Sequence, residues 1–250
     1  MRLTHILSFA LAAATLSILS SARAALIDFE TDPAAALPVD NAALSTPYNL
    51  AGGGTVQFFF DTNSNNSYDA GIDFDPLFEA AGADSGEGFS NGALGGIPDV
   101  ANGGLGAQLG NFFLRYVVPG AIPEPFIIDY NTPQTITALS GEIWDIDGAG
   151  QATEQWLVEV LDSSNNLLTS QLSPLGNSSA LDGLPWVLSF TGLPTGVDKL
   201  RITFLGTKLA GVGLAFNNFN PTAVPEPGGV VLMGLGAVAL VAIGARRRRG

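Results

Sequence analysis

The sequence predicts an all-β protein: a single antiparallel β-sandwich followed by a C-terminal transmembrane helix. Gly, Asn, Asp, Ser, Thr and Pro are spread evenly and separate short runs of Val, Ile, Leu, Phe and Trp, which is typical of sandwiches and barrels. Residues 155–172 form two such runs around a Ser-Ser-Asn-Asn turn, as in a hairpin. Residues 228–245 form an uncharged apolar run of membrane-spanning length.

The expected strands lie between these turn-forming residues. The segment from 61 to 111 is rich in Gly, Asn and Asp, and only a short turn near 76–81 stands out within it. Because a structureless loop of that length is unusual in a compact domain, we expect ions to order it or expect it to pack over one face. The ten expected strands are residues 25–30, 54–60, 112–118, 126–130, 135–147, 155–162, 167–172, 186–191, 199–207 and 212–219.

The two ends of the chain carry export and membrane signals. Residues 1–24 combine a basic start, an apolar stretch and Ala22-Arg23-Ala24, the pattern of a cleaved signal peptide. Residues 228–245, if helical, would reach roughly 27 Å, close to the thickness of a bilayer core. Arginines that follow such a helix stay on the cytoplasmic side. We therefore expect residues 246–250 to form a cytoplasmic arginine cluster. Those arginines are Arg246, Arg247, Arg248 and Arg249.

Pro225, Glu226 and Pro227, followed by an apolar helix and a terminal arginine cluster, resemble the PEP-CTERM sorting signal of Gram-negative bacteria. The resemblance implies an exosortase as partner, which recognises the motif and removes the helix from an inner-membrane precursor. It also implies delivery to the cell surface or the extracellular polysaccharide matrix, and it specifies no activity. We therefore expect a sandwich over residues 25–220, a linker over 221–227, and then the transmembrane helix.

Composition excludes several classes of function. Residues 25–224 hold 22 acidic side chains against four basic ones, a net charge near −18. Such a surface repels phosphate backbones, so nucleic acids are not expected partners. There is no cysteine, and the one histidine, His5, lies in the signal peptide. This removes Ser-His-Asp and Cys-His catalysis and ordinary zinc sites, while the many carboxylates suit calcium.

The first candidate calcium site is the loop from residue 61 to 73. Its oxygen-bearing side chains follow a spacing that resembles a calcium-binding loop, in which alternate residues direct oxygens to one point. Asn66 stands where such a loop has Gly, and Ile72 stands where it has a bidentate Glu. The alternative is a polar turn held by Asx caps. The candidate ligands are Asp61, Asn63, Asn65, Asp69 and Asp73.

The second candidate cation site combines Asp145 and Asp147 with Glu154. The two aspartates share a face of the expected strand, where adjacent carboxylates repel one another unless a cation lies between them. Glycines at positions 148 and 150 would allow the chain to fold back, so that Glu154 joins them. The alternative is a strand end with an Asp-Gly turn that needs no ion.

The third candidate joins both ends of the domain. Residues 26–31 and 213–219 resemble the first and last strands of carbohydrate-binding jelly-roll modules. The resemblance implies a structural calcium held by Glu30 and Asn218, with Asp28 as the alternative ligand on the first strand. The alternative is strand pairing without a metal. Trp144 and Trp186 are the candidate sugar contacts, because an exposed aromatic face stacks on a pyranose ring.

These observations predict an exported, calcium-supported module, jelly-roll-like in fold and without catalytic activity. We expect it to mediate adhesion or to bind extracellular polysaccharide. The alternatives are a structural surface protein without a specific ligand, and a glycoside hydrolase that uses two carboxylates from among Glu142, Glu154 and Glu159.

Overall fold

A computed structural model describes residues 23–24, 26–51, 53–82, 87–149, 151–177 and 181–224. Nearly all of the expected signal peptide lies outside these residues. So do the motif Pro225-Glu226-Pro227, the apolar run 228–245 and the arginines that follow it. Within the described ranges, no helix is both long and apolar enough to cross a membrane.

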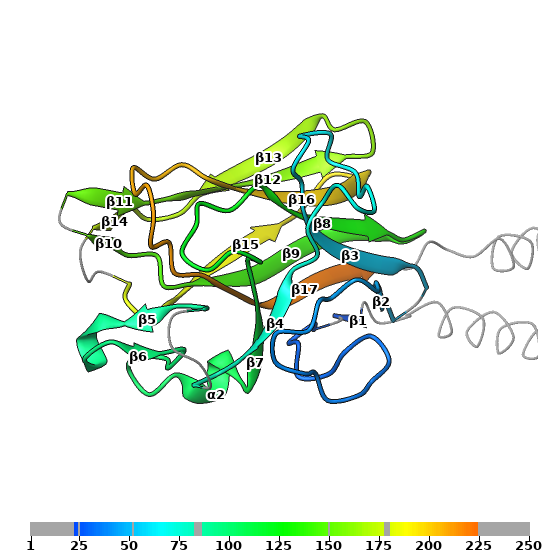
Figure 1. Cartoon of the computed structure of the whole chain (residues 1–250). Coiled ribbons are helices and arrows are strands. Elements are labelled where there is room, and N and C mark those ends of the chain that lie inside the picture. The colour runs from blue at the N-terminus through cyan, green and yellow to red at the C-terminus, as the bar shows by residue number, and fades with distance from the viewer. Residues whose placement is uncertain are drawn as a thin grey trace, which may run out of the picture.

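Two six-stranded antiparallel sheets stack face to face and confirm the all-β expectation (Figure 1). Sheet I has the order β15-β9-β17-β7-β4, with β1 also paired to β17. Its strands are β15 (Pro185–Thr191), β9 (Thr135–Trp144), β17 (Ala215–Val224), β7 (Phe112–Arg115), β4 (Leu77–Ala80) and β1 (Arg23–Ala24).

Sheet II has the order β13-β12-β16-β8-β3-β2. The chain crosses between the sheets repeatedly, so strands that are consecutive in sequence often lie in different layers. The strands of sheet II are β13 (Leu167–Leu172), β12 (Trp156–Asp162), β16 (Val197–Phe204), β8 (Phe126–Asn131), β3 (Thr55–Phe60) and β2 (Tyr48–Asn49).

The main core lies between the two sheets and is dominated by aromatic rings. Phe216 of sheet I stacks on Phe126 of sheet II, with ring centroids 4.3 Å apart, and both residues are fully buried. In β12 the side chains of Trp156, Val158 and Val160 are buried on the inner face, as the alternation of a strand requires. Burial of this apolar area is the main stabilising contribution to the fold.

Smaller elements cover the outer face of sheet I, and they come from the segment in which few strands were expected. Phe89 and Leu109 from this segment pack on Phe113, Trp144 and Ala215, which face away from the main core. The prediction that the segment packs over one face is therefore confirmed. The elements are β5 (Ser90–Asn91), η1 (Gly92–Leu94), β6 (Ile97–Pro98) and α2 (Gly106–Leu109); β5, β6 and α2 are labelled at the lower left of Figure 1.

The β12–β13 hairpin confirms the sequence prediction. The two strands pair antiparallel, and Asn165 at the turn has a φ of 62°, a left-handed conformation that Asn tolerates. Asp162 caps the turn, because its Oδ1 accepts hydrogen bonds from the backbone N–H groups of Ser164 and Asn166.

Four expectations about the elements were wrong. The strand expected at 25–30 is not formed over its described residues, 26–30, of which only Ile27 forms a bridge, to Phe219 of β17. The expected turn at 76–81 is strand β4, because Phe78 is buried and its strand pairs with β7. Strand β9 ends at Trp144, since Asp145 has a φ of 66°. Strand β17 runs through residues 221–224, where a linker was expected.

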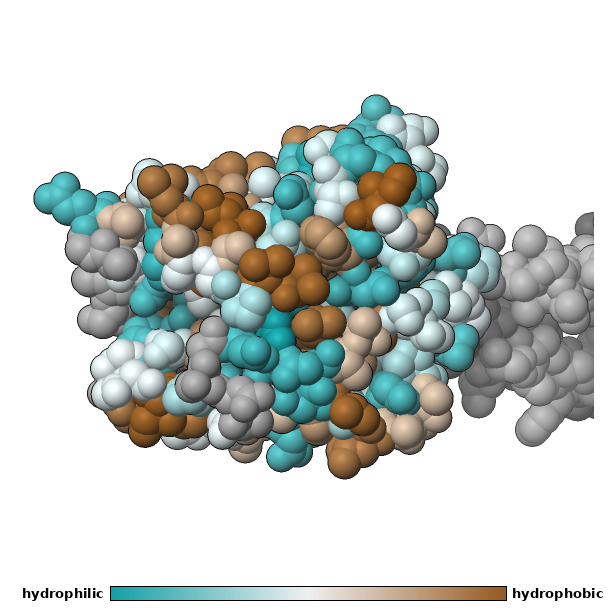
Figure 2. All heavy atoms as spheres, viewed as in Figure 1, coloured by the Kyte–Doolittle hydropathy of each residue, from teal (hydrophilic) through white to brown (hydrophobic). Residues whose placement is uncertain are grey.

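The surface of the sandwich mixes apolar and hydrophilic residues. Figure 2 shows several separate apolar clusters among hydrophilic residues on the viewed face. The large exposed apolar side chains come from many different loops and edge strands, which is ordinary for a protein surface.

Candidate functional site

An acidic cluster lies at one end of sheet I. Side-chain oxygens of Asp145, Asp147 and Asp182 all lie within 4.8 Å of one another. Asp145 and Asp147 follow β9, and Asp182 precedes β15. Because these strands pair antiparallel, with Pro185 opposite Trp144, the end of one strand meets the start of the other. Among the described residues, no other three acidic side chains converge in this way.

Backbone amides hold two of these carboxylates in place. Asp145 Oδ1 accepts a hydrogen bond from Gly183 N at 2.7 Å, and Asp182 Oδ1 accepts one from Gly92 N at 2.8 Å. The backbone at Gly213 passes close to the cluster, because an added Cβ would lie 2.6 Å from Asp145 Oδ2 and 3.2 Å from the Phe89 Cα. The cluster is therefore built by turns and close backbone approaches that constrain its side chains.

Lys208 connects the cluster to Glu154. Its Nζ lies 2.9 Å from Asp147 Oδ1 and 2.7 Å from Glu154 Oε1. A hairpin of β10 (Gly148–Ala149) and β11 (Ala152–Glu154), extended by β14 (Gly176–Asn177), brings Glu154 back beside Asp147, as the sequence predicted. Glu154 is fully buried, and its Oε2 has no hydrogen-bond partner among the described residues.

Burial disfavours the charged carboxylates of this site. It raises the pKa of Asp145 to about 7. The hydrogen bond from Gly183 lowers this pKa, while the nearby charges of Asp147 and Asp182 raise it further. It raises the pKa of Glu154 to about 8, although Lys208 opposes the shift. Burial lowers the pKa of Lys208, but Glu154 and Asp147 more than offset this, so that pKa is raised.

A cleft opens beside the cluster, with a cavity volume of about 250 Å³. Asp145, Asp147 and Lys208 contribute its charged wall, and glycines and Val212 form much of the rest. The cleft has room for several water molecules beside these side chains.

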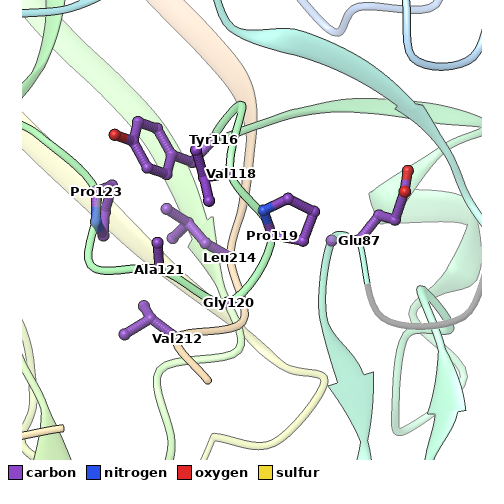
Figure 3. A pocket seen from close by; sticks show the side chains of 10 residues that line it. Glu87, Tyr116, Val118, Pro119, Gly120, Ala121, Pro123, Val212 and Leu214 are labelled. Carbon is purple, nitrogen blue, oxygen red and sulfur yellow. The ribbon is translucent and has the colours of Figure 1, made fainter. Parts of the chain in front are cut away.

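A neighbouring hollow does not suit a ligand. Figure 3 shows Tyr116, Val118, Ala121 and Leu214 gathered around it, while the side chain of Glu87 points away. Its volume of about 10 Å³ holds no more than a single water molecule. Glu87 is instead engaged with the buried Arg115 guanidinium, 2.8 Å from its Nη2.

The loop from residue 61 to 73 is held by its own hydrogen bonds. Asp61 Oδ2 accepts one from Asn66 N at 2.8 Å, and Asp73 Oδ2 accepts one from Asp69 N at 2.7 Å. Asn66 has a φ of 57°, the glycine-like conformation expected at this position. The amide groups of Asn63 and Asn65 donate to Asp69 Oδ2. This network matches the alternative interpretation, a polar turn with Asx caps.

Glu30 and Asn218 line the same cavity, which we call the polar pocket and whose volume is about 480 Å³. The bridge between Ile27 and Phe219 joins the first and last segments of the domain at this point. Glu30 binds Asn111 through the backbone N–H at 2.6 Å and the side-chain amide at 2.8 Å. Polar lining side chains are those of Asp28, Glu30, Gln108, Asn111, Asn217 and Asn218.

Glu142 binds two of the side chains that line the polar pocket. It is almost fully buried on β9, and its Oε2 accepts a hydrogen bond from Asn218 Nδ2 at 2.8 Å. Its Oε1 accepts another from Gln108 Nε2 at 2.8 Å. Asn218 Nδ2 also donates to the backbone carbonyl of Gln108, at 2.9 Å. A rigid strand therefore fixes two of the side chains that line the pocket.

The two tryptophans expected to contact sugars are placed differently. Trp144 is fully buried against the elements that cover sheet I, and its Nε1 donates to Glu142 Oε2 at 3.0 Å. It cannot present a ring to a ligand, so that prediction was wrong. Trp186 is partly buried and packs against the main core.

Sequence reasoning missed Asp182 and Lys208. Both lie far along the chain from Asp145, and their approach depends on strand pairing that the sequence does not show. A usable signal existed for Lys208: it is one of only four basic residues between 25 and 224. Each of the four forms an ion pair with an acidic side chain, so its partners could be sought among nearby carboxylates.

Comparisons with known proteins give only distant similarity. No protein-family model matches the chain, and no curated protein matches it. The K2 cleaved adhesin domain of Lys-gingipain is 10% identical, with 81% of this chain and 99% of that chain covered and a TM-score of 0.39. The K3 cleaved adhesin domain of Lys-gingipain from Porphyromonas gingivalis W83 is 13% identical, with 74% and 99% covered and a TM-score of 0.30.

Proposed function

We propose that this protein is an exported, non-catalytic surface module that binds extracellular polysaccharide through the polar pocket. The observation that carries the proposal is the lining of that pocket by carboxylate and carboxamide side chains. These groups supply both hydrogen-bond donors and acceptors, which is what a sugar hydroxyl needs, since it donates and accepts. A volume of about 480 Å³ is in the range of ligand pockets.

The charge of the pocket narrows the class of polysaccharide. Asp28 and Glu30 make the lining acidic, and the expected mature chain has a net charge near −18. An acidic polymer would be repelled, so the proposed ligand is a neutral or amino-sugar polysaccharide. The lining includes no aromatic side chain, so binding at one pocket rests on hydrogen bonds. Many copies of the module on one surface would strengthen attachment through avidity.

The carboxylates considered for glycoside hydrolysis are engaged in other contacts. Glu154 is buried and bound to Lys208, and Glu159 is bound to Arg201. Glu142 accepts hydrogen bonds from Trp144 and Asn218. None of the three carboxylates lines the polar pocket, which favours binding over catalysis there.

The proposed route to the surface is the C-terminal tail. Strand β17 ends at Val224, so the Pro225-Glu226-Pro227 motif follows directly on the folded sandwich. Glu226→Ala, with the apolar run and the arginines intact, should leave an unprocessed precursor in the inner membrane. Immunoblots of membrane and extracellular fractions would measure this. Normal maturation of the variant would replace exosortase sorting with a plain membrane anchor.

Binding is tested with the full-length chain, by co-sedimentation with purified extracellular polysaccharide of the producing bacterium. Asn111→Ala removes an exposed polar group of the pocket and should weaken binding about tenfold, the effect of one lost hydrogen bond. Asn63→Ala is the matched control, because it removes an exposed Asn in the loop at 61–73. Equal binding by both variants would refute the pocket. No binding by the wild type would favour a structural surface protein.

A further inference from the structure

The expected signal-peptide cut and the sorting motif lie next to each other in the folded chain. Strand β1 consists of Arg23 and Ala24, the last two residues before the expected cut. It pairs antiparallel with the end of β17, with Arg23 opposite Ala223 and Ala24 opposite Thr222 (Figure 1). Pro225, the first residue of the motif, lies two positions beyond Ala223. Two segments far apart in the sequence therefore meet at the points where we expect the chain to be cut.

This pairing occupies the second edge of β17, because the first edge pairs with β9 as far as Val224. It also continues the bridge between Ile27 and Phe219, which consists of two backbone hydrogen bonds of 2.8 and 3.0 Å. Hydrogen-bonded pairs alternate with non-bonded pairs along an antiparallel ladder. Counted along the register from this bridge, Arg23 and Ala223 stand in a hydrogen-bonding position. The end of β17 is therefore enclosed on both edges while β1 is attached.

Loss of the signal peptide opens this second edge. A cut after Ala24 removes β1 but keeps Ile27, so the bridge to Phe219 remains while Thr222 and Ala223 lose their partners. The mature β17 then has an open edge directly before the sorting motif. An open edge presents backbone N–H and C=O groups to which another chain can add a strand. A protease that binds its substrate as an extended strand can use such an edge, whereas a strand paired on both sides offers none.

We propose, on the basis of the sorting route given above, that exosortase adds a strand to the edge of β17 at Thr222 and Ala223, which we call the docking edge. The attached signal peptide covers this edge through β1. Removal of the tail therefore follows removal of the signal peptide. The same pairing holds the residues before the first cut in a ladder, so a precursor that folds too early hides both cuts.

The experiment compares full-length chains that keep the signal peptide, expressed in the producing bacterium. Ala22→Leu with Ala24→Leu blocks the first cut, because that site requires small residues, and leaves every backbone N–H in place. Its tail should be removed about tenfold more slowly than that of the wild type, because the docking edge must open first. Pulse-chase immunoblots, with mass spectrometry of both chain ends, measure the rate.

A second substitution separates strand pairing from mere attachment of the signal peptide. Arg23→Pro, added to the uncleaved chain, removes a backbone N–H from the ladder. Its tail should be removed at nearly the wild-type rate although the signal peptide is still attached. Arg23→Ala in the same chain is the matched control, because it changes the side chain but keeps the N–H, and tail removal should remain slow.

The outcomes distinguish the docking edge from the sorting route. If the wild type keeps its tail, the sorting route is wrong, and the docking edge with it. If the wild type and the uncleaved chain lose their tails equally fast, sorting stands and the docking edge is wrong. If Arg23→Pro stays as slow as Arg23→Ala, attachment of the signal peptide causes the delay, and strand pairing does not.

Hydrogen exchange of the purified uncleaved chains gives a readout that needs no exosortase. The backbone amide of Ala223 should exchange about tenfold faster with Arg23→Pro than with Arg23→Ala, because its partner strand is lost. Equal exchange in the two chains would show that β1 does not protect the end of β17, and the docking edge would be rejected.

Discussion

Replacing Phe216 with Ala tests how the two sheets are joined. Phe216 is 0% exposed on β17, in the middle of sheet I. Its ring stacks on Phe126 at 4.3 Å and lies 6.2 Å from the ring of Phe60 and 6.1 Å from that of Trp156. These three partners come from three different strands of sheet II. A single side chain therefore connects one sheet to three strands of the other.

The expected loss of stability follows from the packing of Phe216 between the two sheets. Truncating a buried Phe to Ala costs about 3–5 kcal/mol, with the larger values where the surroundings cannot collapse into the cavity. Rigid strands on both sides of Phe216 favour the upper half of that range. For a domain of this size, each kcal/mol shifts Tm by about 2–4 °C, so we expect a fall of roughly 8–20 °C. The urea m-value should not change, because the same surface unfolds.

Heat and urea unfolding of the full-length chain, followed by tryptophan fluorescence, measure the effect. Val187→Ala is the control: this β15 side chain is 52% exposed in the same sheet, so its loss should cost no more than about 0.5 kcal/mol. A double-mutant cycle with Phe126→Ala should show a coupling of about 0.5–1.5 kcal/mol. A loss below about 1 kcal/mol for Phe216→Ala, or strict additivity, would refute the stacked arrangement.

Three further predictions concern other parts of the sandwich. Burial raises the pKa of Glu79 from 4.5 to about 7 despite the opposing effect of Arg115. The folded protein therefore holds this proton more tightly than the unfolded chain, and stability should fall as pH rises from 4.5 to 7. Glu79→Gln should flatten that part of the Tm–pH curve. An unchanged slope would show that other groups cause the pH dependence. Asn165→Ala should cost about 1–2 kcal/mol in urea unfolding, because Ala resists the φ of 62°, while Asn165→Gly should be nearly neutral. Gly141→Ala should cost about 1–3 kcal/mol, because the new Cβ would lie 2.4 Å from the Phe219 ring; an unchanged urea midpoint would show that the ring can move away.

The sequence predicted best those features that depend on near neighbours. The hairpin of β12 and β13 follows from two apolar runs and the Asn-rich turn between them. Strand β4 was missed because Glu79 interrupts its short apolar run. The structure shows that this carboxylate is buried on Arg115, with Nε 2.6 Å from Oε2, a partner on another strand that no local pattern reveals.

Contacts between distant parts of the chain were also missed at the candidate sites. Asp145, Asp147 and Glu154 are close along the chain, and the structure places Asp145 and Asp147 in one cluster while Lys208 joins Glu154 to Asp147. Asp182 arrives through the pairing of β15 with β9, which depends on the topology of the whole sheet. Trp144 was misjudged for a related reason: the elements that cover it come from a segment with weak local signals.

The position of β17 would have a mechanical consequence if the protein were attached through its C-terminal end, as proposed above. This strand is ten residues long, lies in the interior of sheet I, and pairs with β9 as far as Val224. A pull on that end acts along the strand, whereas its inter-strand hydrogen bonds lie across it. The load is then shared in shear by many bonds at once. A pull across the edge strand β13 would instead open its hydrogen bonds to β12 one after another, so attachment through the C-terminal end would resist a larger force.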